Sequence, residues 1–343
     1  KKDFYQYYAT MMEPWDGPAS ILFSDGDIMG AVLDRNGLRP SRYYVTNDGY
    51  LILSSEVGVL PIAESRIKVK DRLRPGKMLL VDTVKGELID DDELKEKYAT
   101  KQPYGEWLDN NLVQLHDLKI PNQKVPMHTK EERARLQKAF GYTYEDLKTS
   151  ILPMALNGSE SIGAMGIDTP LAVLSNKHQP LFNYFKQLFA QVTNPPIDSI
   201  REKVVTSTTV YLGTDGNVLE EKAENCKQLK INDPILTNTD LLKIKNMKVD
   251  GFKVETIPII YYKNTSLEKA IDHLFVEVDR AHREGANIII LSDRGVDENH
   301  VAIPSLLAVS ALQQYLVQTK KRTAMAVILE SGEPRQRDVH LLH

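Results

Sequence analysis

The feature that most constrains the fold is an alternation of apolar strands and helices in the last third of the chain. Three short apolar runs, TIPIIYY (256–262), NIIILSD (287–293) and AMAVILES (324–331), alternate with helical patterns at 266–285 and 303–319. Near-continuous apolar strands separated by helices are typical of a parallel sheet that is covered on both faces. The sequence therefore predicts a parallel βαβαβ unit here.

The first hundred residues predict an antiparallel sheet instead. Short apolar or alternating runs are separated by Asp-Gly, Asn-Gly and similar dipeptides, which are the strongest short-range signal of a β-hairpin. The expected strands are 19–24, 28–34, 41–46, 50–56, 77–83 and 86–89, and the turn dipeptides are Asp25-Gly26, Asn36-Gly37, Asp48-Gly49 and Lys85-Gly86.

The middle of the chain is predicted to be mostly helical. Thr129 and Glu132 form a capping-box pattern in front of a helix, and Thr143 caps the next one. Further helices are expected at 90–101, 104–118 and 176–192. The domain boundaries that we infer are 1–106 for the first domain, 107–128 for a linker and 129–343 for the second domain.

Composition excludes several classes of function. The 343 residues carry a formal net charge of −4 and no long apolar run, so we expect neither a nucleic-acid nor a membrane partner. With no signal peptide visible either, we expect a cytoplasmic protein. The acidic runs Asp90-Asp91-Asp92 and Glu220-Glu221 are expected to be solvated.

The sequence predicts no metal site. Cys226 is the single cysteine, which excludes an iron–sulfur cluster, and we expect it at the surface or half-buried. His273 and His282 lie nine residues apart on one predicted helix, on opposite faces.

The carboxyl ends of the predicted parallel strands are the place where such sheets bind ligands. Two loops follow these strands, SDRG (292–295) and ESGEPR (330–335), and Asp293 or Glu330 could face a ligand there. An α/β module that binds a nucleotide or a flavin is therefore an alternative interpretation. The chain has no glycine-rich phosphate loop, which favours loop capping and packing for these residues.

Several longer segments resemble the large subunits of glutamate synthases. MMEPWDGPA (11–19) followed by DRNGLRPSRYY (34–44) is similar to the end of their glutaminase domain, which is an amidotransferase with an N-terminal nucleophile. Segments of the second half are similar to their central domain. These are QKAFGYTYEDL (137–147), SIGAMGIDTPLAVLS (161–175), QLFAQVTNPPIDSIRE (187–202), IIILSDRG (288–295), IPSLLAVSAL (303–312) and GEPRQRDVH (332–340).

The resemblance implies a fold and an activity. The fold would be the C-terminal part of an αββα amidotransferase sandwich, followed by an α/β central domain with the parallel βαβαβ unit. Members of the family are oxidoreductases that hydrolyse glutamine, pass ammonia through an internal channel and make glutamate from 2-oxoglutarate by a flavin-dependent reduction. FMN and an iron–sulfur cluster are implied for the parent enzyme. The implied partners are the FMN domain of the same chain and a small electron-donating subunit.

The resemblance also implies what this chain does not hold. The family's nucleophile is an N-terminal cysteine whose α-amino group acts as the base, whereas this chain begins with Lys1. We therefore expect a fragment with no catalytic residue, no cofactor of its own and no activity by itself.

Two groups of residues are candidates for supporting roles. Asp34, Arg35, Asn36, Gly37 and Arg39 are expected to form a hairpin turn, with Asp34 paired to Arg35 or Arg39, or to support the glutaminase pocket from behind. Main-chain carbonyls of Thr193 and Asn194 are candidates for lining the ammonia channel, since Pro195-Pro196 forces an extended exit from the preceding helix. The alternative for this second group is a simple helix stop.

Overall fold

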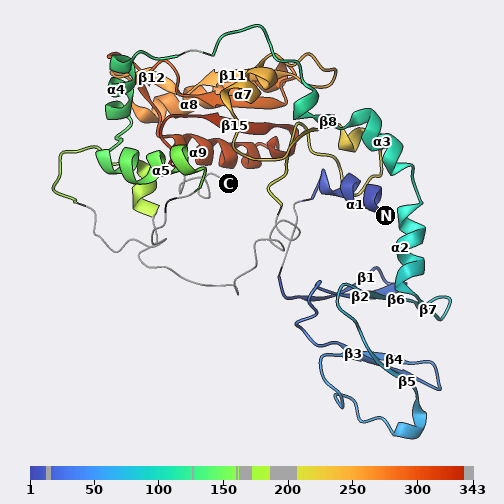
Figure 1. The fold of residues 1–343 in the computed structure, drawn as a ribbon. Helices are drawn as coiled ribbons and strands as arrows, with labels where there is room; N and C mark the ends of the chain where they lie inside the picture. The colour runs from blue at the N-terminus through green and yellow to red at the C-terminus, as the bar shows by residue number, and fades with distance from the viewer. Residues whose placement is uncertain (13–16, 126, 160, 162–171, 186–206, 336–343) are drawn as a thin grey trace. The chain divides into compact units, whose positions relative to one another are not determined.

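A computed structural model describes residues 1–12, 17–125, 127–159, 161, 172–185 and 207–335 (Figure 1). The chain is a mixed α/β protein with several sheets and divides into two compact units. Among the described residues, the first unit holds 1–110, Ser207 and Val218–Cys226, and the second unit holds the others.

The first unit contains a four-stranded antiparallel sheet in the order β1-β2-β6-β7. The predicted hairpins at Asp25-Gly26 and Lys85-Gly86 are confirmed, because these turns join β1 to β2 and β6 to β7. The strands are β1 (Ser20–Ser24), β2 (Ile28–Leu33), β6 (Met78–Asp82) and β7 (Glu87–Ile89).

A second sheet in this unit has the order β4-β3-β5. The Asp48-Gly49 hairpin is confirmed between β3 (Arg42–Thr46) and β4 (Leu51–Ser54). Strand β5 (Ile67–Arg72) was not expected, because its IKVKDR sequence alternates with charges on an exposed edge. A small core of Ala31, Leu33, Leu73 and Leu79 packs with Tyr43, Leu51 and Leu53 from this sheet.

The expected hairpin at Asn36-Gly37 is wrong. Strand β2 pairs with β1 and β6, while β3 pairs with β4 and β5, so the turn carries the chain from one sheet to the other. An Asn-Gly pair specifies the local reversal of the chain, but long-range pairing decides which strands become neighbours.

The α-helices described in the first unit are α1 (Lys2–Ala9), α2 (Asp91–Ala99) and α3 (Tyr104–Asn111), and the 3₁₀ helix η5 (Ala223–Cys226) also belongs to it. The short 3₁₀ helix η1 (Glu64–Arg66) precedes β5. The helix expected at 104–118 is wrong beyond Asn111, because the main chain of Val113 pairs with Leu229 in a parallel ladder. That pairing forms β8 (Val113–Gln114), and the short 3₁₀ helix η2 (Leu115–Asp117) follows.

The second unit contains the predicted parallel sheet, with strands β11 (Val254–Pro258), β13 (Ile288–Ser292) and β15 (Ala326–Glu330). Their register is parallel throughout. Helix α8 (Leu267–Arg283) connects the first two strands, and α9 (Ser305–Gln318) connects the last two. The βαβαβ prediction is therefore confirmed.

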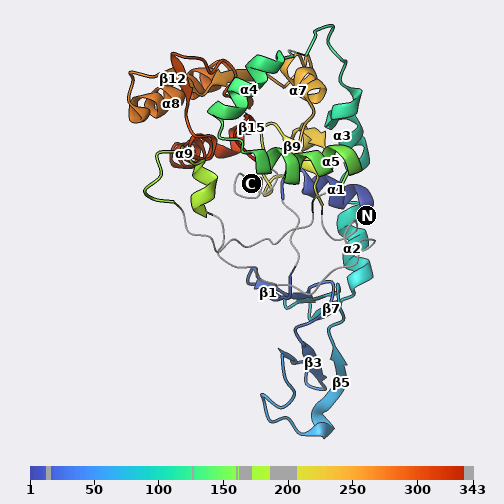
Figure 2. The ribbon, with the colours of Figure 1, turned by 60° about the vertical axis from the view of Figure 1, so that its left-hand side comes forward.

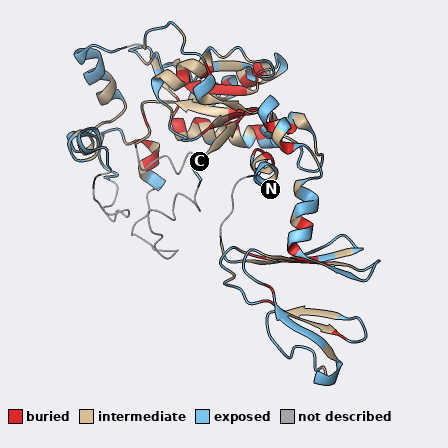
Figure 3. Cartoon of the chain, turned by 45° about the vertical axis from the view of Figure 1, so that its right-hand side comes forward, coloured by how far each residue is buried: buried red, intermediate tan, exposed pale blue. Residues whose placement is uncertain are grey.

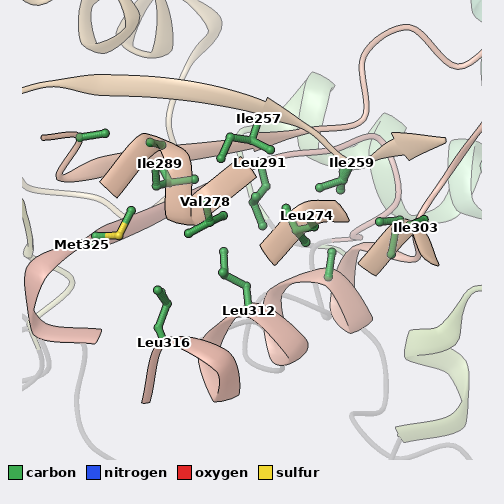
Figure 4. Packing of buried hydrophobic residues seen from close by; sticks show 14 residues of the cluster. Ile257, Ile259, Leu274, Val278, Ile289, Leu291, Ile303, Leu312, Leu316 and Met325 are labelled. Carbon is green, nitrogen blue, oxygen red and sulfur yellow. The ribbon is translucent and has the colours of Figure 1, made fainter. Parts of the chain in front are cut away.

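Both faces of this sheet are buried, as predicted. Strand β13 is buried at every position, and its alternate side chains enter two different cores. Ile289 and Leu291 pack against α8 and α9 through Leu274, Val278 and Leu312 (Figure 4). The opposite face meets helix α7 (Asn238–Lys245) and a small sheet through a second core. That core includes Ile288, Ile290, Ala326, Leu241, Ile244, Leu212, Leu229 and Ile231. Figure 3 shows this concentration of buried residues.

Two small sheets flank the parallel sheet. The predicted strand at 256–262 is broken after Pro258, and its second part, β12 (Ile260–Tyr262), pairs with β14 (His300–Ala302). The three-stranded sheet β8-β10-β9 was not predicted, because β9 (Val210–Leu212) and β10 (Leu229–Ile231) are too short to show a period.

The remaining elements of the second unit are short helices (Figure 2). The capping box of Thr129 and Glu132 is confirmed at α4 (Lys130–Ala139), and the Thr143 hydroxyl accepts from the Asp146 N–H. The chain continues through the π-helix η3 (Asp146–Ile151) and α5 (Leu152–Asn157). Of the helix expected at 176–192, the structure describes a 3₁₀ helix, η4 (Leu181–Phe185), and the residues from 186 lie outside the described part.

Among the residues that the structure describes, no helix combines the length and apolar character needed to cross a membrane.

Candidate functional site

The turn at residues 34–40 is organised by the carboxylate of Asp34. Its Oδ2 accepts hydrogen bonds from the main-chain N–H groups of Asn36 at 2.9 Å and Gly37 at 3.1 Å. Its main-chain oxygen accepts from Gly37 and from Gly76. Asp34 thus ties the turn to itself and to the connection that leads into β6. Its pairing with Arg35 or Arg39 stays a prediction.

Gly37 is required by the backbone of this turn. Its φ of +61° lies in the left-handed region, and a Cβ there would lie 2.6 Å from Cγ of Pro75. A side chain would therefore meet both a backbone penalty and a steric one.

The second carboxylate oxygen of Asp34 and the two arginines are the remaining candidate groups of the turn. Within the described residues, the buried Oδ1 of Asp34 has no hydrogen-bond partner. Arg35 and Arg39 are exposed. A buried carboxylate oxygen without a donor is costly.

The second candidate region is the carboxyl end of the parallel sheet, where three carboxylates gather. Glu330 ends β15, and its Oε2 accepts from Lys245 Nζ and Ser292 Oγ, both at 2.8 Å. Arg294 forms an ion pair with its other oxygen. Burial raises the pKa of Glu330, but the bonds from Arg294, Lys245 and Ser292 outweigh this and hold the pKa below its usual range.

Asp293 lies in the loop after β13 and is buried. Its carboxylate accepts from Ser331 Oγ at 2.6 Å and from the Gly332 N–H at 3.1 Å. Burial is the largest influence and raises the pKa of Asp293, since those two bonds offset only part of the cost.

Glu333 occupies the N-terminus of α9. Its Oε2 accepts from the main-chain N–H of Ser305 at 2.6 Å and from the Ser305 hydroxyl at 2.7 Å. A helix N-terminus attracts anions through its free N–H groups and its dipole. Here the carboxylate of Glu333, from the same chain, occupies the anion position.

The loop that carries Glu333 is also held from the α4 side. The guanidinium of Arg335 lies 3.7 Å from the ring centre of Tyr142 and donates to the Phe140 carbonyl at 2.8 Å. Tyr142 in turn donates its hydroxyl to the Gly332 carbonyl at 3.0 Å. Residues 330–335 are thus fixed between the sheet, α9 and the segment after α4.

This arrangement favours packing over ligand binding at the sheet edge. Asp293, Glu330 and Glu333 all bind groups of their own chain, and the N-terminus of α9 is already filled by a carboxylate. The alternative of a nucleotide- or flavin-binding module is not favoured.

Other predicted site residues have different outcomes. Thr193 and Asn194 lie outside the described residues. Cys226 is fully buried, which corrects the expectation of a surface or half-buried residue, and burial raises its pKa to about 11. No group of three metal-binding side chains occurs among the described residues. With its single cysteine, the chain does not fit an iron–sulfur cluster.

Two acidic residues expected in solvent are not solvated. Asp91 is buried and pairs with Lys77 at 2.7 Å and Lys95 at 3.0 Å. Glu221 is 17% exposed and pairs with Lys101 at 3.0 Å. Sequence reasoning missed both because the lysines that neutralise them are recognised only in the folded chain.

Two family models match the chain in sequence order. The model described as glutamine amidotransferases class-II matches residues 1–107, and the model described as glutamate synthase central domain matches residues 135–342.

Curated relatives match almost the whole chain. It is 46% identical to the glutamate synthase [NADPH] large chain of Bacillus subtilis, over 98% of this chain and 22% of that protein. It is 42% identical to ferredoxin-dependent glutamate synthase 2 of Synechocystis, over 96% of this chain and 21% of that protein. For the glutamate synthase [NADH] of Saccharomyces cerevisiae the identity is 40%, over 98% and 16%. The chain therefore spans about a fifth of the length of these relatives.

Proposed function

The chain belongs to the glutamate synthase family, and from this premise we propose that it works as part of a longer enzyme that makes glutamate from glutamine and 2-oxoglutarate. The two domain matches, in order and over nearly the whole chain, carry this proposal. In it, residues from the N-terminal match supply glutaminase scaffold, and the rest supply the central domain between the two reaction sites.

The four-stranded sheet of the first unit supports an αββα sandwich for the glutaminase part. Ile21 and Phe23 point to one face of β1 and Leu22 to the other, and all three are 46–62% exposed. Met29 on β2 is also exposed, at 56%. A sheet that is apolar on both faces needs a layer on each side. An αββα sandwich provides both, with a second sheet on one face and helices on the other.

In this proposal the turn at Asp34 supports the glutaminase pocket from behind. The Asp34 Oδ1 that lacks a donor would receive one from the part of the pocket that the described residues do not include. Arg35, Asn36, Gly37 and Arg39 keep the turn in place beside it.

A substitution in the full-length enzyme tests this role. Asp34→Asn is expected to lower glutamine-dependent glutamate formation at least about tenfold, since a charged hydrogen-bond acceptor is lost, and to leave ammonia-dependent formation unchanged. Asp25→Asn is the matched control, because Asp25 accepts main-chain N–H groups in the exposed β1–β2 turn. Equal glutamine-dependent rates for the two variants would contradict the role.

We propose that the central domain acts as a spacer and channel wall, with Thr193 and Asn194 lining the ammonia passage. Replacing Pro195-Pro196 by two glycines in the full-length enzyme should loosen this segment. The expected result is more free ammonia released per glutamate formed. Unchanged release would count against a passage at this segment.

We propose that the chain by itself is inactive, because it spans only about a fifth of the length of its relatives. Purified chain incubated with glutamine should release no ammonia above background, and turnover would overturn this expectation.

FMN and the iron–sulfur cluster would be held by the rest of the enzyme, with the FMN domain and a small electron-donating subunit as partners. The absorbance bands of a bound flavin in the spectrum of the purified chain would contradict that assignment. A cytoplasmic location stays a prediction.

A further inference from the structure

The segment Val218–Cys226, called here the 218–226 segment, packs on a different part of the protein from the residues on either side of it. It lies within the match to the central domain, yet it groups with the first unit, while the described residues on both sides of it group with the second. The helices it meets, α1 and α3, lie largely in the amidotransferase match. A stretch of nine residues in one domain match is thus packed on elements of the other.

Glu221 is the most strongly held side chain of this segment. It accepts from the Tyr8 hydroxyl of α1 at 2.9 Å and pairs with Lys101 at 3.0 Å. Burial raises its pKa, but the bonds from Lys101 and Tyr8 lower it by more, so the carboxylate stays charged. Tyr104 lies beside it: burial first, and then the charge of Glu221, raise the pKa of Tyr104 to about 12.

A second anchor is formed by Tyr7, which is fully buried. Its hydroxyl donates to the Lys222 carbonyl at 2.7 Å and accepts from the Lys222 N–H at 3.1 Å. Asn225 Nδ2 also donates to this hydroxyl at 3.2 Å. One tyrosine of α1 therefore satisfies both main-chain groups of a residue in the 218–226 segment.

The end of the segment is buried against aromatic rings. Trp107 lies 5.5 Å from Tyr7 between ring centres, and Cys226 Sγ lies 3.4 Å from the Trp107 carbonyl oxygen. Buried aromatic side chains contribute large apolar areas. The packing and the polar bonds together hold the segment on α1 and α3.

The flanks of the segment are hydrogen-bonded to other residues of the second unit. The Asp215 N–H donates to the Thr323 carbonyl at 2.7 Å, and Thr214 Oγ1 donates to the Ala324 carbonyl at 3.2 Å. On the other side, the Val113 N–H donates to the Gln228 carbonyl at 2.9 Å, next to β10.

We propose that the 218–226 segment is a tether from the central domain to helices α1 and α3, and that Glu221 is the positioning residue that anchors it. Helix α1 and most of α3 lie in the amidotransferase match, so the tether holds a piece of the central-domain match on elements of the glutaminase part. This proposal rests on the proposed function. The tether is therefore expected to affect coupling, measured as the glutamine hydrolysed for each glutamate formed.

The test uses the full-length enzyme and a matched pair of variants. Glu221→Gln keeps the size of the side chain and removes the charge that Lys101 and Tyr8 share. Glu220→Gln is the control, because Glu220 is an exposed neighbour that pairs with Lys222. Hydrogen exchange of residues 218–226 is followed by mass spectrometry, and glutamine consumed and glutamate formed are measured in the same reaction.

Glu221→Gln should speed exchange in the segment about tenfold, since charged hydrogen bonds are lost, and raise the ratio of glutamine hydrolysed to glutamate formed. The ammonia-dependent reaction should keep its rate, which a general loss of structure would not allow. Tyr8→Phe should act in the same direction, and Tyr5→Phe, at an exposed ring, should not.

Two results would overturn the proposal. Equal exchange in Glu221→Gln and Glu220→Gln would show that Glu221 is not the anchor. Faster exchange with an unchanged ratio would show that the tether does not serve coupling. If wild-type enzyme makes no glutamate from glutamine and 2-oxoglutarate, the proposed function fails instead, and the exchange data still decide whether Glu221 is the anchor.

Discussion

Glu333 and Ser305 form the contact that closes the carboxyl edge of the parallel sheet. One carboxylate oxygen accepts from both the main-chain nitrogen and the hydroxyl of Ser305, at 2.6 and 2.7 Å, and both residues are buried. The contact joins the loop after β15 to the first residue of α9, so the last described loop and the helix depend on each other.

Replacing Glu333 should therefore destabilise the chain. Glu333→Ala leaves a buried N–H and a buried hydroxyl without an acceptor, which costs about 1–3 kcal/mol in unfolding free energy. Urea denaturation of the purified chain measures the change. Glu298→Ala, at an exposed glutamate, is the control, and a loss of equal size in both variants would contradict the role of the contact.

Asp293 should make stability depend on pH. Its pKa is raised chiefly by burial, so the folded chain keeps a proton that the unfolded chain has released. Unfolding free energy should therefore fall as the pH rises from the usual aspartate range through the raised pKa. Asp293→Asn should remove this slope, whereas Asp272→Asn, at an exposed position of α8, should retain it. A slope that persists in Asp293→Asn would argue against this assignment.

Glu330 should contribute a slope of the opposite sign. Its bonds to Arg294, Lys245 and Ser292 outweigh burial and lower its pKa. The stability that it contributes is present above the usual glutamate range and is lost as the pH falls through the lowered pKa. The difference in unfolding free energy between wild type and Glu330→Gln should shrink in acid. A constant difference across that range would show that the carboxylate is not held in its charged form.

Cys226 should be unreactive in the folded chain. It is fully buried, and burial raises its pKa to about 11, so little thiolate exists near neutral pH. An aromatic disulfide reagent should titrate no thiol in native protein and one thiol per chain in denaturant. Rapid reaction of native protein would mean that the α1–α3 packing opens readily.

Gly37 offers a test of backbone strain. Gly37→Ala meets both a φ of +61° and a Cβ placed 2.6 Å from Pro75, so the loss should exceed the roughly 1 kcal/mol typical of a left-handed alanine. Gly86→Ala is the matched control, with a φ of +69° and no atom within 4 Å of its Cβ. Equal losses in unfolding free energy would show that the Pro75 contact yields without cost.

Local signals predicted the elements that have strong patterns. The Ser266 cap, the apolar face of α8 and the buried strand β13 are all readable from neighbouring residues. The sheet β8-β10-β9 is not, because its strands have two or three residues each. These strands form only because distant segments pair, and no local periodicity in the sequence predicts that pairing.

The candidate site shows the same division. The sequence makes Asp293 and Glu330 candidates because they follow parallel strands, and the structure places both at that edge. The sequence did not reveal that Ser331, Lys245 and Ser305 would bind the three carboxylates there. Those partners are far apart along the chain or lie on other elements, and only folding brings them together.

By itself, the sequence determined the family, the parallel βαβαβ unit and the position of most turns, because hydrophobic periodicity and turn chemistry act between near neighbours. Only the tertiary structure decided that Asn36-Gly37 links two sheets, that Asp91 and Glu221 are shielded from solvent, and that the 218–226 segment packs on α1. Burial of a charge depends on a partner from elsewhere in the chain. Tyr8 and Glu221 are 213 positions apart in the sequence, so no local pattern shows that they meet.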